Sequence, residues 1–189
     1  PLPLGNITAY ARSQGIRLEQ DDLHIKIHYD NYFSKDQEKK INEEVFFDIP
    51  RVIRYAKGEK DTGLDEIMDK VSLKTDFNGY KIILFSLDSC SMNDSHVMFA
   101  LCLARYLKKK HNPIIILGGL NYFVELMRKN GCDFLDLDYV ICFEGEEIIV
   151  NLLLSILKLS SFRTQNIKVE EGGRVIKSMK VPKPIKPDF

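Results

Sequence analysis

The chain has 189 residues, of which 44% are apolar and 29% charged, as is typical of a folded globular domain rather than a disordered or fibrous protein. Its 27 basic and 27 acidic residues balance, so no overall field favours nucleic acid or an anionic membrane as a partner. No apolar run is long enough to span a membrane, and no secretion signal opens the chain, so the sequence predicts a cytoplasmic protein.

The four cysteines, Cys90, Cys102, Cys132 and Cys142, are widely separated. Their spacing matches neither a zinc site nor an iron-sulfur cluster, so we expect small buried thiols in a reducing compartment, except for Cys90, which lies in a predicted loop. The chain begins with proline, from which we expect either processing or the loss of an upstream part.

The amino-terminal part predicts a loop over residues 1–5 and a helix over 6–14, which Gly15 ends. Residues 16–27 alternate between apolar and polar, as a half-buried strand does. Because a helix follows a strand in a doubly wound fold, the first strand is expected before Pro1 and is missing from this chain.

Between residues 30 and 79 the sequence becomes polar and predicts an insertion of helices, over 34–44, 50–57 and 64–71. Its mixed charge run at 35–40 is typical of a solvated helix face, and we assign the insertion no chemistry.

Three apolar runs then alternate with helical segments. Strands are predicted over 81–86, 113–120 and 138–143, and helices from 97 to 107, 122 to 129 and 146 to 159. Runs too apolar to alternate are typical of strands buried on both faces, so we predict parallel strands joined by helical crossovers, an α/β layer architecture.

The last part changes character. Residues 165–170 and 174–179 flank Glu171-Gly172-Gly173 and predict a β-hairpin, and the proline-rich residues 181–187 predict an extended linker. We therefore divide the chain into an α/β domain over 1–160 and a hairpin with linker over 161–189.

Loops at 86–91, 118–121 and 144–147 each follow a predicted strand and should meet at the carboxyl edge of the sheet, where ligands of such sheets bind. A hydroxyl-rich loop and two glycine loops suit a large ligand with polar edges. The Gly118-Gly119 pair serves either ligand approach or helix packing. Glu144 and Glu146 are candidates for acid/base chemistry, but acidic residues also favour the first turn of a helix because of its dipole.

Leu117-Gly118-Gly119, Tyr139-Val140 and residues 143–147, in this order and spacing, resemble the cobalamin-binding domain of radical S-adenosylmethionine enzymes. Pro3-Leu4-Gly5 with the helix after it, and the hydroxyl loop that begins at Ser86, are also similar to that family. The resemblance implies a flavodoxin-like (Rossmann-like), doubly wound, mainly parallel sheet with helices on both faces. The residues it assigns to cobalamin binding are Leu4, Gly5, Ser86, Ser89, Ser91, Gly118, Gly119, Leu120, Glu144, Gly145 and Glu146.

In the wider cobalamin-binding fold, a D-x-H-x-x-G loop supplies a histidine that ligates cobalt. Counting back from Gly5, the position of that histidine holds Leu2, so the resemblance implies base-off cobalamin with no histidine ligand from the protein. Residues 94–99 imitate the motif, but Phe99 stands where glycine is required, and capping of a helix by Asp94 is the preferred interpretation.

The family's cluster motif, C-x-x-x-C-x-x-C, does not occur in the chain. The resemblance therefore implies that S-adenosylmethionine and a 4Fe-4S cluster belong to a barrel domain of the same full-length chain, to which the hairpin and the final Pro-Asp-Phe would connect. By this resemblance, the present chain would bind cobalamin but contribute no catalytic residues. The parent would be methyltransferase-like, acting on a small molecule or peptide that the sequence does not identify.

Three other functions stay open. Asp88 follows a strand, as the phosphoacceptor of a receiver-like signalling domain does, although the acidic pair that such a site needs is missing. A glycine loop before a helix can also bind the phosphate of a flavin or nucleotide, although no G-x-G-x-x-G or Walker sequence is present. A scaffold that only docks a partner is the third.

Overall fold

The structure is a computed structural model of the chain, and it describes residues 2–30, 32–87, 94–118, 136–142, 146–158, 167–170 and 175–178. The helices are α1 Leu2–Ser13, α2 Leu23–Tyr29, α3 Lys35–Lys40, the π-helical η1 Ile41–Phe46, α4 Ile49–Ala56, α5 Thr62–Lys74, α6 Asp94–His111 and α8 Glu146–Ile156. The strands are β1 Ile82–Ser86, β2 Ile114–Gly118, β3 Tyr139–Cys142, β4 Ile167–Glu170 and β5 Val175–Ser178. The predicted helix 122–129 and linker 181–187 lie outside the described residues.

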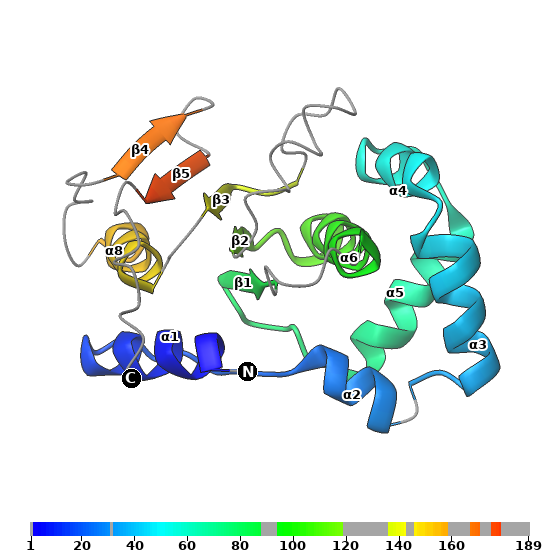
Figure 1. The fold of residues 1–189 in the computed structure, drawn as a ribbon, viewed down its shortest axis with the longest axis horizontal. Coiled ribbons are helices and arrows are strands. Elements are labelled where there is room, and N and C mark those ends of the chain that lie inside the picture. The colour runs from blue at the N-terminus through cyan, green and yellow to red at the C-terminus, as the bar shows by residue number, and fades with distance from the viewer. Residues whose placement is uncertain are drawn as a thin grey trace, which may run out of the picture.

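The strands form one sheet in the order β1-β2-β3-β5-β4 (Figure 1). β1, β2, β3 and β5 run parallel, and β4 pairs antiparallel with β5. The three predicted strands and the predicted hairpin are thus confirmed, although β1, at the edge of the sheet, is only partly buried. The hairpin also extends the sheet, because β5 pairs directly with β3.

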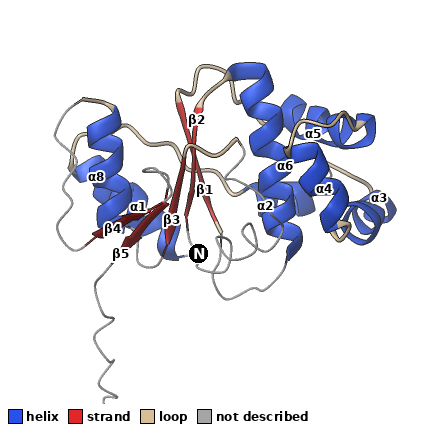
Figure 2. Cartoon of the chain, turned by 90° about the horizontal axis from the view of Figure 1, so that it is seen from above, coloured by secondary structure: helices blue, strands red, loops and turns tan. Residues whose placement is uncertain are grey.

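Helices cover both faces of the sheet, with α1 and α8 on one side and α6 on the other (Figure 2). The strand side chains alternate between two apolar clusters. Ile115, Leu117 and Val140 pack in the cluster that contains α6, whereas Ile116 and Ile141 pack in the cluster of α1 and α8. Because both faces are buried, the strands read as continuous apolar runs, as the sequence predicted.

Helix α1 begins earlier than predicted. The predicted helix over 6–14 is present, but α1 starts at Leu2, so the expected loop around Pro3-Leu4-Gly5 is wrong. A proline in the first helical turn costs little, because the N–H that it lacks would have no partner there. Gly5 is therefore a helical residue.

The predicted strand over 16–27 is wrong: residues 16–22 form no regular secondary structure, and the chain then forms α2. The Asp22 carboxylate accepts a hydrogen bond from the backbone N–H of Ile25 at 3.0 Å and caps this helix. Leu23 and Ile27 are four residues apart and pack together on the α6 cluster, while Ile25 is 50% exposed. The alternation of Leu23, Ile25 and Ile27 therefore comes from a helix that packs Leu23 and Ile27 against the core and leaves Ile25 exposed.

The three helices predicted between residues 30 and 79 are confirmed, with η1 continuing α3. They do not stand apart from the α/β layers. Val52, Leu64 and Met68 are fully buried in the same cluster as Leu103 of α6 and Ile115 of β2. Helix α6 therefore lies between the sheet and the helical region (Figure 1), and the two parts share one core.

An ion pair fastens α4 to the start of α5. Arg51 donates two hydrogen bonds to the Asp61 carboxylate, at 2.5 and 2.8 Å, and the same carboxylate accepts the backbone N–H of Leu64 at 3.0 Å. The Arg51 guanidinium holds the pKa of Asp61 below its ordinary value. The folded state thus favours the charged form of Asp61.

We expect Asp61→Asn to lower the free energy of unfolding by about 1–2 kcal/mol at pH 7, because asparagine keeps the helix cap but loses the charge-assisted pair. The loss should be constant above the unfolded pKa of about 3.9 and shrink as the pH falls through the lower folded pKa, where Asp61 itself is neutralised. Urea unfolding at several pH values measures this. Glu66→Gln, at an exposed position of α5, is the control. A loss that persists at low pH would contradict the assigned cause.

Candidate functional site

The carboxyl ends of β1 and β2 bring Ser86 and Gly118 side by side. The two residues are partners in the parallel ladder, and the backbone N–H of Leu87 donates to the Gly118 carbonyl at 3.0 Å. Two of the three predicted loops therefore start at neighbouring points of one edge, as the alternation of strands and helices predicts. That these residues bind a cofactor stays a prediction.

Gly118 is not required by the packing around it. A Cβ at this position would stand 3.7 Å from Cδ1 of Ile149 in α8 and 4.0 Å from the carbonyl oxygen of Phe85. Both distances are ordinary van der Waals contacts, so the described residues leave room for a methyl group there. Packing among them does not require glycine, and close approach of a ligand stays a prediction.

Gly5 has even more room. It is exposed on α1, and no heavy atom of the described residues lies within 4 Å of where its Cβ would be. Ile7, two residues later, packs in the same cluster as Ile149, so α1 and α8 line the same side of the sheet. A glycine inside a helix costs about 1 kcal/mol relative to alanine, and no contact among the residues that the structure describes offsets that cost.

The other predicted site residues are placed only in part. Leu4 lies in α1 and Glu146 is the first residue of α8. The remaining ones lie outside the described residues: Ser89, Ser91, Gly119, Leu120, Glu144 and Gly145. Asp88, the phosphoacceptor of the receiver-like alternative, lies outside them as well.

Among the described residues, no group of three histidine, cysteine or acidic side chains is arranged to hold a metal ion. Cys102 and Cys142 are buried, as predicted, and neither forms a disulfide among the described residues; burial raises the pKa of Cys102. None of the described helices combines the length and apolar character that crossing a membrane requires.

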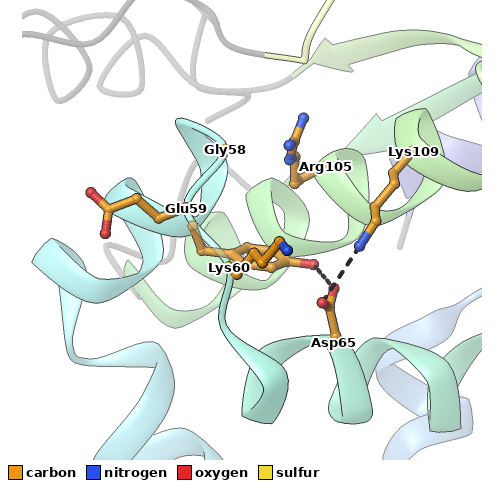
Figure 3. A pocket seen from close by; sticks show the side chains of 7 residues that line it. Gly58, Glu59, Lys60, Asp65, Arg105 and Lys109 are labelled. Atoms are coloured by element: carbon orange, nitrogen blue, oxygen red, sulfur yellow. Dashed lines mark hydrogen bonds and ion pairs between the residues drawn. The ribbon is translucent and has the colours of Figure 1, made fainter.

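A second feature lies between α4, α5 and α6, where a pocket of about 120 Å³ opens (Figure 3). Sequence reasoning missed it, because it assigned no chemistry to residues 30–79. The pocket is lined by Tyr55, Gly58, Glu59, Lys60, Asp65, Arg105 and Lys109. The only local sign of the pocket in the sequence is Gly58, which ends a helix. Two residues of the lining, Arg105 and Lys109, come from α6, which is distant along the chain.

The loop that ends α4 shapes one wall of the pocket. Gly58 has φ of +106°, and its N–H donates to the carbonyl of Tyr55 at 2.9 Å, while Glu59 N–H donates to Arg54 at 3.1 Å. This helix ending needs the left-handed region, which glycine occupies without strain. A Cβ on Gly58 would also stand 3.4 Å from NH2 of Arg105. Glycine therefore lets the Arg105 guanidinium approach the loop.

Ion pairs connect the pocket walls. Asp65 accepts the Tyr55 hydroxyl at 2.7 Å and lies 3.6 Å from Nζ of Lys109 (Figure 3). Burial of the ring, together with the Asp65 carboxylate, raises the pKa of Tyr55. Arg105 reaches Asp136 with NH1 at 3.3 Å. The lining therefore contains three cationic and two acidic side chains.

The carboxyl edge offers the Ser86 hydroxyl, the glycine backbone at the end of β2 and the apolar cluster of α1 and α8. Among the described residues it also carries one exposed acid, Glu147, in the first turn of α8. A hydroxyl and a glycine backbone beside an apolar cluster suit the binding of a large ligand more than nucleophilic catalysis. When the chain was compared with protein-family models, curated proteins and solved structures, nothing matched.

Proposed function

We propose that this chain is the cobalamin-binding domain of a radical S-adenosylmethionine enzyme, with a flavodoxin-like, doubly wound sheet. The observation that carries the proposal is the room around Gly118, which lies beside Ser86 at the carboxyl edge and belongs to the glycine motif that resembles this family. Gly5 supports it independently, because it too belongs to the motif and has no packing reason to be glycine.

Cobalamin fits this edge in its chemistry. Its nucleotide tail is long and has an apolar base and a polar phosphate and sugar, and the edge combines the Ser86 hydroxyl with the apolar cluster of Ile7 and Ile149. Ser86 and Gly118 would hold the tail, and the predicted loop residues would complete the cradle. The histidine position of the wider fold holds Leu2, so the cofactor would be base-off, with no histidine ligand from this chain.

Bound cobalamin would supply group-transfer chemistry at its cobalt. The residues of this chain would bind the cofactor, orient it and shield its tail from water. S-adenosylmethionine and a 4Fe-4S cluster would be held by a barrel domain of the same full-length chain. We propose methyl transfer as the reaction of that parent enzyme, with a small molecule or peptide as its substrate.

Binding of hydroxocobalamin to the purified 189-residue chain tests the proposal. We expect the cofactor to co-migrate with the protein on desalting at about one equivalent, with a visible spectrum changed from that of the free cofactor. Flavin mononucleotide and acetyl phosphate are the comparison ligands. Failure of cobalamin to co-migrate at micromolar concentrations, retention of the flavin instead, or labelling of Asp88 by acetyl phosphate would contradict it.

A further inference from the structure

We propose that the pocket between α4, α5 and α6 binds a phosphate group. Three cationic side chains, those of Lys60, Arg105 and Lys109, line a space of about 120 Å³, which is large enough for one tetrahedral anion (Figure 3). Arginine and lysine are the residues that bind phosphate oxygens by charge-assisted hydrogen bonds. The site goes beyond the proposed cobalamin binding and does not depend on it.

The two acidic side chains of the lining are already engaged. Asp65 accepts the Tyr55 hydroxyl at 2.7 Å and lies 3.6 Å from Lys109. Glu59 lies 3.6 Å from Nε of Arg54, outside the lining, and Figure 3 shows its carboxylate turned away from Arg105 and Lys109. The acids therefore leave part of the positive charge uncompensated.

That surplus belongs to Lys60, whereas Arg105 is paired with Asp136 and contributes further N–H donors. Lys60 makes no ion pair or hydrogen bond within the part of the chain that the structure describes. Arg105 has a side chain only 30% exposed, and one of its five N–H donors reaches Asp136, at the long distance of 3.3 Å. Among the described residues, Asp136 is the one hydrogen-bond acceptor of Arg105, so its half-buried guanidinium can donate further charge-assisted hydrogen bonds to an anion.

The carboxyl end of α4 also borders the pocket, and its dipole opposes an anion. That opposition is reduced, because the carbonyls of Arg54 and Tyr55 already accept the N–H groups of Glu59 and Gly58. The absence of a side chain at Gly58 additionally leaves NH2 of Arg105 accessible from the loop side. The positive charge of the lining side chains is thus larger than the partial negative charge at the end of α4.

The pocket lies away from the carboxyl edge of the sheet. Helix α6 follows the loop after β1, and Arg105 and Lys109 lie in its last two turns, just before β2. A phosphate bound there would be at the opposite end of α6 from Ser86. The two sites can therefore be tested separately on the same chain.

Titration with inorganic phosphate, followed by NMR at constant ionic strength, tests the proposal. We expect saturable shifts of residues around the pocket with a dissociation constant of about 1 mM or below, and sodium chloride and acetate at equal ionic strength should not reproduce them. Lys60→Gln and Arg105→Gln should each weaken binding by about tenfold or more. Lys39→Gln, which removes an exposed charge on α3, is the matched control.

Lys60 is exposed, so its variant keeps the fold and provides a clean measurement even if Arg105→Gln disturbs the contact with Asp136. The proposal is overturned if shifts fail to saturate by about 20 mM phosphate, which would correspond to no more than weak ion screening. It is equally overturned if chloride or acetate gives the same shifts, or if Lys39→Gln weakens binding as much as Lys60→Gln.

Discussion

Replacing Leu103 by alanine is expected to lower the free energy of unfolding by about 3–4 kcal/mol, the largest effect on stability that we predict. Leu103 lies in the middle of α6 and has no exposed surface. It belongs to the cluster that joins β2 to the helical region, so the cavity would open where these parts meet. Because the sheet and the helical region pack against Leu103 from both sides, neighbouring atoms cannot move far into the cavity. We therefore expect a loss of stability in the upper part of the range for buried leucine-to-alanine substitutions.

The same variant tests whether the helical region and the sheet unfold together. Urea unfolding followed by circular dichroism should give one transition in the wild type and one, at lower urea, in Leu103→Ala. Leu73→Ala on α5 is the matched control, because that leucine is 86% exposed and its truncation should change stability by less than about 0.5 kcal/mol. Two separate transitions, or a loss below about 1 kcal/mol, would show that α6 does not join the two parts as described.

The strands and helices of the α/β layers could be predicted because the hydrophobic pattern of each segment is sufficient to identify it. The runs over 81–86, 113–120 and 138–143 have no charged residue between their ends, and such a run folds as a strand with helices on both sides. The helix after Asp94 shows the period of an amphipathic helix and carries Lys108, Lys109 and Lys110 at its negative end. Both signals are contained within one segment, which is why they succeeded.

The failures arose where local patterns were ambiguous. Leu23, Ile25 and Ile27 fit a strand and also fit one helix face with an extra apolar residue, and the Asp22 cap decided for the helix. Leu2 to Gly5 looked like a loop because it combines proline with glycine, yet both are tolerated in α1. In both cases packing against α6 or α8 contributed energy that propensity does not contain.

The pocket between α4, α5 and α6 could not be found from the sequence at all. Its cations come from positions 60, 105 and 109, and α5, β1 and the first part of α6 lie between the first of these and the other two. Their meeting depends on how α6 packs on α4 and α5, a property of the whole core. By contrast, Ser86 and Gly118 could be paired in advance, because the ends of neighbouring parallel strands always meet.

Gly118→Ala is expected to weaken cobalamin binding by about ten- to a hundredfold while leaving the protein at least as stable as the wild type. The methyl group meets only ordinary contacts in the protein, with Ile149 at 3.7 Å, and alanine is the better residue in a strand by about 0.5–1 kcal/mol. A ligand that lies against the bare backbone would instead be displaced by the added methyl, at a cost of about 1–3 kcal/mol of binding. Affinity and stability should therefore change in opposite directions.

That opposition makes the variant a sharp test of the proposed function, because a glycine kept for packing would lose stability and affinity together. Hydroxocobalamin titration and urea unfolding on the same preparation measure both quantities. Ala100, buried in α6 on the other face of the sheet, offers the control Ala100→Gly, which should lower stability and leave cobalamin affinity unchanged. If Gly118→Ala binds cobalamin as tightly as the wild type, the cofactor does not lie against the end of β2, and the proposed orientation of its tail is wrong.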